Sequence, residues 1–160
     1  MTDRRLYLVR HGLAVRSAWD GPDEKRPLTP AGVERLERSA TFMAGLRLDV
    51  DLIVTSPLVR AAQTAEILVA ALAPAGGVVA DERLAWGFDT EALAGLLADH
   101  AGRLLLTGHE PGFSTVAGAV TGGSHLACKK GSLLRIDLWS EAPVRGELVW
   151  LIPPKAMAGN

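Results

Sequence analysis

The chain has 160 residues, of which 48% are hydrophobic and 22% charged, and its formal net charge is −1 at pH 7. This length and balance predict one soluble globular domain over residues 1–160. Because there is no basic excess and no apolar run near the roughly 20 residues that span a bilayer, we expect neither nucleic acid nor a membrane as a partner.

Short apolar runs alternate along the chain with segments of helical periodicity. In chain order, strands are expected at residues 6–9, 52–54, 78–79, 104–106, 133–138 and 148–152, and helices at 30–45, 57–72, 90–99 and 111–120. The runs at 6–9, 52–54 and 104–106 are apolar throughout, which indicates that helices cover both faces of their sheet. The alternation predicts an α/β fold, a three-layer α/β/α sandwich. No helix separates the last two strands, so we expect a mixed, mostly parallel central sheet.

Two of the expected helices follow a capping signal. Thr29 is expected as an N-cap with Pro30 in the first turn, and Gly45 is the expected stop. Ser56 and Pro57 repeat the pattern, so Ser56 is expected to cap the helix that runs to about residue 72.

Residues suited to phosphate follow three of the expected strands. Arg10 and His11 follow the first strand. Ser56 and, one helical turn later, Arg60 follow the second, and His109 follows the strand at 104–106. Because the carboxyl ends of parallel strands lie at one edge of a sheet, we expect these side chains to converge. The arginine fork matches phosphate oxygens, and helix N-termini favour an anion.

The two histidines indicate chemistry on that phosphate. A neutral imidazole is a competent nucleophile, and flanking arginines should keep His11 neutral at pH 7. Protonated His109 is expected to donate a hydrogen bond to a phosphoryl oxygen. Arginines are poor neighbours for a cation, so no metal is expected.

Three motifs carry a resemblance to a known family. Residues 8–12 resemble the signature of the histidine phosphatase superfamily, which includes cofactor-dependent phosphoglycerate mutases. Residues 56–65 and Gly108–Glu110 resemble its second and third motifs. The segment Arg26–Thr29, followed by Gly32, is similar to the SixA-like phosphohistidine phosphatase branch. The resemblance covers the chain from residue 6 to about residue 138.

The resemblance implies that His11 becomes phosphorylated and that Arg10, Arg60 and His109 bind the phosphoryl group. It also implies a mixed, mostly parallel sheet between helices. The proton donor stays open among four carboxylates. Many relatives carry a mid-chain glutamate where Glu82 stands, whereas the SixA-like branch favours a loop aspartate. The candidates are Asp23, Asp20, Glu24 and Glu82.

We therefore expect a metal-independent phosphatase without a cofactor, which acts on protein phosphohistidine through a phosphohistidine intermediate. A phosphatase of small phosphate esters and a non-catalytic phosphate-binding regulatory module are the alternatives. Cys128 is the only cysteine, so no internal disulfide can form and the cytosol is the expected compartment. The expected catalytic residues are His11, Arg10, Arg60, His109 and Asp23, and the expected substrate-binding residues are Gly12, Arg26, Ser56, Gly108 and Glu110.

Overall fold

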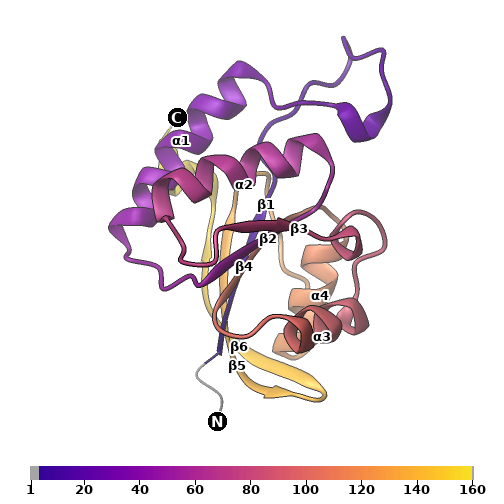
Figure 1. Cartoon of the computed structure of the whole chain (residues 1–160), viewed down its shortest axis with the longest axis vertical. Coiled ribbons are helices and arrows are strands. Elements are labelled where there is room, and N and C mark those ends of the chain that lie inside the picture. Colours follow the sequence, from indigo (N-terminus) through magenta and orange to yellow (C-terminus); the bar gives the residue numbers. More distant parts are fainter. Residues whose placement is uncertain (1–3, 160) are drawn as a thin grey trace.

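A single mixed sheet runs through the middle of the structure (Figure 1), a computed structural model that describes residues 4–159. Within these residues the strands are β1 Arg4–Arg10, β2 Leu52–Thr55, β3 Val78–Ala80, β4 Leu104–Gly108, β5 Leu133–Glu141 and β6 Val144–Ile152. They lie in the order β3-β2-β4-β1-β5-β6. The first four pair in parallel, and β5 and β6 join them antiparallel.

Helices connect the strands on both sides of this sheet. In the described part of the chain the α-helices are α1 Pro30–Gly45, α2 Val59–Leu72, α3 Thr90–Asp99, α4 Gly112–Thr121 and α5 Pro154–Ala158. Two short 3₁₀ helices, η1 Asp23–Lys25 and η2 Glu82–Leu84, lie in the loops. None of the helices in residues 4–159 is long and apolar enough to cross a membrane.

Alternate residues of the central strands supply two separate cores. Leu6 and Leu8 of β1 belong to the cluster with α3 and α4, whereas Tyr7 and Val9 belong to the cluster with α1, α2 and α5. All four side chains are fully buried. Figure 1 shows α1 and α2 on one side of the sheet and α3 and α4 on the other. The predicted three-layer α/β/α sandwich around a mixed, mostly parallel sheet is confirmed.

Capping side chains fix the boundaries of two helices. The N–H of Gly32 donates to Thr29 Oγ1 at 2.9 Å, and α1 runs from Pro30 to Gly45 as predicted. The predicted helix at 90–99 also matches α3, whose N-cap Asp89 accepts from the Ala92 N–H at 2.8 Å. A side-chain acceptor thus satisfies one of the free N–H groups at the start of each helix.

The helix after β2 begins later than the sequence predicts. Ser56 is not its N-cap, because α2 starts at Val59 with Leu58 at the N-cap and no side-chain cap bond. Instead, the Leu58 N–H donates to Ser56 Oγ at 3.2 Å, within the turn between β2 and α2. The same Oγ lies 2.7 Å from Nε2 of His109. Ser56 therefore connects this turn to the carboxyl end of β4.

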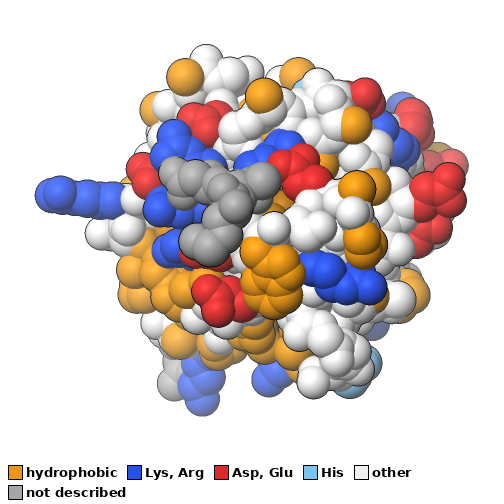
Figure 2. Space-filling view, turned by 90° about the horizontal axis from the view of Figure 1, so that it is seen from below, with side chains coloured by type: hydrophobic (Ala, Val, Ile, Leu, Met, Phe, Trp, Pro, Cys, Tyr) orange, Lys and Arg blue, Asp and Glu red, His pale blue; other side chains and the backbone are white. Residues whose placement is uncertain are grey.

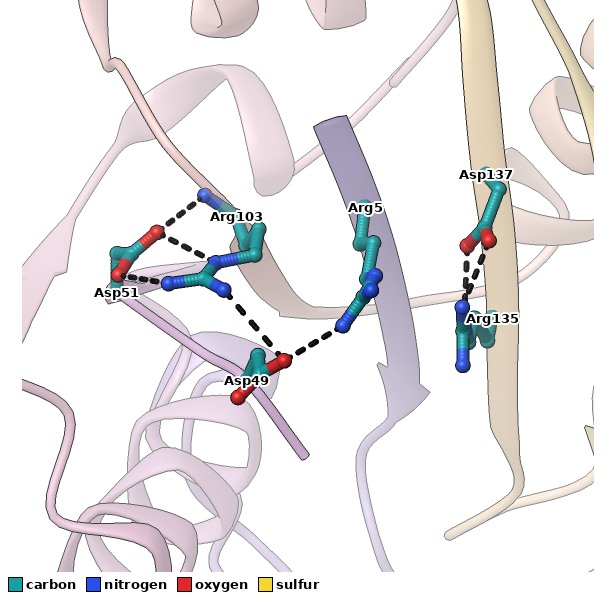
Figure 3. Close-up of polar contacts among 6 residues, drawn as sticks. All are labelled: Arg5, Asp49, Asp51, Arg103, Arg135 and Asp137. Atoms are coloured by element: carbon teal, nitrogen blue, oxygen red, sulfur yellow. Dashed lines mark hydrogen bonds and ion pairs between the residues drawn. The ribbon is translucent and has the colours of Figure 1, made fainter. Parts of the chain in front are cut away.

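Charged side chains at the end of the sheet where the parallel strands begin pair with one another (Figure 3). Arg103 donates to both carboxylate oxygens of Asp51, each at 3.0 Å, and these bonds lower the pKa of Asp51 to about 2. Asp49 lies between Arg103 and Arg5, at 3.5 and 2.6 Å. Viewed from below in Figure 2, charged side chains of both signs are interspersed. The carboxylates of Asp49 and Asp51 therefore neutralise the arginines at this end of the sheet.

Candidate active site

Strand pairing brings His11 and His109 together. β1 and β4 are parallel neighbours, and their register sets Arg10 opposite Gly108. The two histidines are the next residues, and the backbone N–H of His11 donates to the Gly108 carbonyl at 3.0 Å. Their ring centroids are 5.2 Å apart. The carboxyl edge of the sheet therefore places two imidazoles side by side.

The imidazole of His11 is buried and has a defined tautomer. Its Nδ1 lies 2.7 Å from the Gly12 carbonyl oxygen. Because a carbonyl oxygen only accepts, Nδ1 carries the hydrogen, and Nε2 of the neutral ring keeps a lone pair. The residue is 5% exposed, and burial is the largest cause that lowers its pKa to about 3. The arginines add less than burial does, so the predicted neutral state has a different main cause from the one the sequence indicates.

Arg60 is the buried cation of the site. It lies in the first turn of α2 and is 4% exposed. Its Nη1 donates to the backbone oxygen of Asp23 at 2.9 Å, and its Nη2 lies 3.1 Å from Asp23 Oδ2. Arg26 Nε donates to the other carboxylate oxygen at 3.1 Å. These bonds hold the loop with η1 at the carboxyl edge, where Figure 1 shows it beyond the strand ends.

Asp23 is the loop carboxylate that contacts this arginine pair. Its side chain is 48% exposed. Slight burial raises its pKa, but the hydrogen bonds and charges of Arg26 and Arg60 outweigh this and lower the pKa below its ordinary value. Asp23 is therefore ionised at pH 7. Of the other proton-donor candidates, Asp20 and Glu24 are exposed in the same loop and Glu82 is exposed in η2.

Several buried nitrogens of the site are available to an anion. Arg10 Nη1 donates to the Cys128 carbonyl at 2.9 Å. Arg10 Nε, Arg60 Nε and His109 Nδ1 have no hydrogen-bond partner among residues 4–159. An unsatisfied buried donor costs about 1–3 kcal/mol, and an oxyanion supplies acceptors that suit arginine. The described residues contain no group of three His, Cys, Asp or Glu side chains that could hold a metal ion.

His109 differs from the protonated donor that the sequence predicts. Burial, followed by the charge of Arg60, lowers its pKa to about 4, so it is neutral at pH 7 in the free protein. Its Nε2 shares a 2.7 Å hydrogen bond with Ser56 Oγ. In the free protein His109 is therefore neutral, and its hydrogen bond to a phosphoryl oxygen stays a prediction. A neutral ring still offers one N–H donor.

The two motif glycines allow close packing behind the site. A Cβ on Gly12 would lie 2.4 Å from Leu36 Cδ1, and a Cβ on Gly108 would lie 2.8 Å from the Phe113 ring. The Gly12 N–H donates to Thr64 Oγ1 at 3.2 Å. Glycine is therefore required at both positions, because a larger side chain would clash and would displace the backbone that carries the histidines.

Glu110, expected to bind substrate, is bound to α4. The Ser114 N–H donates to Glu110 Oε1 at 3.0 Å, and the Ser114 hydroxyl donates to Oε2. The carboxylate therefore satisfies a free N–H in the first turn of α4, directly after the loop that carries His109.

Two residues that the sequence did not single out as ligands lie around the site. Burial, followed by the charges of Arg16 and Arg10, lowers the pKa of half-buried Lys130, which places this lysine among the cations. The exposed indole of Trp86 stacks on His109, with ring centroids 6.1 Å apart. Both come from loops, where no periodicity or motif marks them.

The histidine pKa values lead to a testable prediction. In an NMR titration of the imidazole carbons, we expect His11 and His109 to stay neutral well below pH 6.5 and to titrate near pH 3 and pH 4. His11→Gln and His109→Gln variants would assign the two signals. A His11 signal that titrates near pH 6.5 would contradict the buried neutral ring.

The same shifts predict how stability depends on pH. The folded-state values lie below the roughly 6.5 of an unfolded histidine, so the unfolded chain binds protons that the folded chain does not. The contribution of the two neutral histidines to the free energy of unfolding is fully present above about pH 6.5. It is lost as the pH falls toward 4 and then 3. Urea midpoints measured between pH 7 and pH 4.5 should decrease, and less steeply in His11→Gln.

Comparisons with known proteins agree with this geometry. Residues 6–85 match the model of the histidine phosphatase superfamily, branch 1. An uncharacterized protein of Picosynechococcus sp. is 37% identical over 167 residues, which cover 94% of this chain and 96% of the relative.

Solved structures with a similar fold include two phosphatases. The protein histidine phosphatase SixA, in complex with tungstate, has a TM-score of 0.81 and 21% identity, over 94% of this chain and 97% of SixA. A mycobacterial glucosyl-3-phosphoglycerate phosphatase has a TM-score of 0.71 and 19% identity, over 94% and 100%. The same fold thus serves phosphatases with different substrates, and the choice of substrate depends on the site.

Proposed function

The chain belongs to the histidine phosphatase superfamily and is a phosphatase, and we propose that it dephosphorylates protein phosphohistidine through a covalent intermediate on His11. The observation that carries this proposal is the buried, neutral imidazole of His11 beside two arginines. We propose Arg10, Arg60 and His109 as the groups that bind the phosphoryl oxygens. A cytosolic compartment and a phosphorylated protein partner complete the proposal.

In the first step, the lone pair of His11 Nε2 attacks phosphorus. The bond between phosphorus and the substrate nitrogen breaks, and its electron pair leaves with that nitrogen. Nδ1 keeps its hydrogen, which it donates to the Gly12 carbonyl oxygen, so the phosphorylated ring of His11 carries a positive charge. No proton has to move on His11, and the charged ring is a good leaving group for the next step.

In the second step, water attacks phosphorus and the bond to Nε2 breaks. The electron pair returns to the His11 ring, and inorganic phosphate is released. Asp23 accepts a proton from the attacking water, a role that requires the ionised carboxylate that Arg26 and Arg60 stabilise. The positive charges of Arg10 and Arg60 stabilise the transferring group in both steps.

The ionised state of Asp23 supports a phosphohistidine substrate. An alkoxide leaving group needs a proton from a general acid, which an ionised carboxylate cannot give. The imidazole of phosphohistidine, once protonated on its other ring nitrogen, leaves as a neutral molecule. Asp23 can then accept a hydrogen bond from that N–H. The site therefore fits a nitrogen–phosphorus bond better than the phosphate ester of an alcohol.

A comparison of substrates tests this choice. General acid catalysis contributes about 10²- to 10⁴-fold, so kcat/KM for a phosphohistidine peptide should exceed that for the matched phosphoserine peptide and for a sugar phosphate by about 10²-fold. An aryl phosphate, whose leaving group needs little protonation, is the positive control. If the esters react as fast as the phosphohistidine peptide, the proposed substrate is wrong.

A further inference from the structure

An apolar cavity opens directly beside the proposed phosphoryl site. Its volume is about 250 Å³, and His109 and Glu110 form its border with the site. Pro111, Leu84, Phe88 and Trp86 contribute its apolar surface. The Phe88 ring meets the core residue Phe113 edge-on, with centroids 5.8 Å apart, so this wall is anchored in the core.

Trp86 is the exposed part of this wall. The residue is 63% exposed, yet its ring lies nearly parallel to His109, with an interplanar angle of 17° and centroids 6.1 Å apart. The ring of His109 therefore lies next to both the His11 ring and the Trp86 indole. A phosphoryl group bound by His109 would adjoin this cavity, because His109 and Trp86 both line it.

The Asp23 side of the site has a different character. There Arg16, Trp19, Asp23 and Arg26 surround a second hollow whose surface is mainly polar. The two sides therefore favour different parts of a substrate. A flat, apolar ring fits the Trp86 side, because aromatic rings stack on one another and apolar surface is better removed from water.

We infer that Trp86 and the cavity it borders form a subsite for a flat ring bonded to phosphorus, which for the proposed function is the imidazole of phosphohistidine. This inference deepens the proposed function and rests on it for the identity of the natural ring. Trp86 acts as a specificity-determining residue. It favours ring-bearing phosphoryl compounds over those whose substituent is small or polyhydroxylated.

Binding of two phosphonates tests the subsite without any reaction. Phenylphosphonate and methylphosphonate share the anionic group and differ in the ring. By calorimetry, we expect the wild type to bind phenylphosphonate about tenfold more tightly, the effect of one aromatic pair. Trp86→Ala should remove this difference and leave methylphosphonate binding unchanged, and Trp86→Phe should restore part of it. Trp139→Ala is the matched control, because Trp139 is also exposed (52%) but lies on β5.

A parallel measurement of turnover separates this inference from the proposed function. Phosphoimidazole and phosphoramidate both contain a nitrogen–phosphorus bond, but only the first carries a ring. Trp86→Ala should raise KM for phosphoimidazole about tenfold with little change in kcat, and leave phosphoramidate unaffected. If Trp86→Ala weakens both phosphonates equally, the indole merely supports His109 and the subsite is wrong. If the phenylphosphonate preference depends on Trp86 but neither compound is hydrolysed, the subsite stands and the proposed function fails.

Discussion

Replacing His11 with alanine is expected to lower kcat/KM for a phosphohistidine peptide by at least about 10⁴-fold, the scale seen when a nucleophile is removed. His11 supplies the atom that bonds to phosphorus, and no neighbouring group duplicates its position. The nearest imidazole, His109, is engaged through Nε2 with Ser56. Steady-state kinetics with the purified variant measures the loss.

The His11→Ala variant is expected to fold. The backbone bond from the His11 N–H to Gly108 does not involve the side chain, so the end of β1 keeps its anchor. The far-ultraviolet circular dichroism spectrum and a cooperative thermal transition check this. His125→Ala, at an exposed position, is the control for histidine replacement. Turnover by His11→Ala within tenfold of the wild type would contradict the assignment of the nucleophile.

Replacing Arg60 with alanine is expected to lower kcat/KM by about 10²- to 10³-fold, the range for loss of one charged or hydrogen-bonding group at a transition state. Arg60 has two roles in the site. It is a buried cation next to the histidines, and it binds Asp23 through both the backbone and the carboxylate. Its loss therefore removes charge and releases the loop that carries η1.

Asp23→Asn separates these two roles of Arg60. This variant keeps the cation and the bond from Arg60 to the Asp23 backbone, but loses the carboxylate charge. We expect Asp23→Asn to slow hydrolysis of the phosphorylated enzyme, so that phosphoenzyme accumulates in the steady state. Arg60→Ala should instead slow its formation. If phosphoenzyme forms as fast in Arg60→Ala as in the wild type, Arg60 does not bind the transferring group.

Much of the fold follows from local signals in the sequence. Apolar runs predicted all six strands. Thr29 and Asp89, as N-caps, define where α1 and α3 begin. The sequence predicts the start of α2 incorrectly, because Ser56 forms a hydrogen bond with His109, which is 53 residues away in sequence. The first residues of β6 were missed because this edge strand alternates exposed and buried positions, as at Arg145 and Gly146.

Part of the site could likewise be predicted from local sequence, and part depends on contacts between distant residues. His11 and His109 could be predicted as neighbours because each follows a strand, and strand register then sets them opposite each other. The cause of their lowered pKa values could not be predicted from the sequence, because the burial that lowers them depends on the packed structure. Trp86 and Lys130 were missed because loops without periodicity bring them to the site.

The most direct test of the phosphohistidine intermediate is to trap it. A phosphohistidine peptide labelled with ³²P is mixed with the enzyme, the reaction is stopped in alkali within milliseconds, and the protein is separated and mapped by mass spectrometry. We predict acid-labile, alkali-stable phosphate on Nε2 of His11, absent from His11→Ala and increased in Asp23→Asn. Turnover with no covalent phosphate, or with phosphate on another residue, would contradict the mechanism, and binding with neither turnover nor label would indicate a phosphate-binding module.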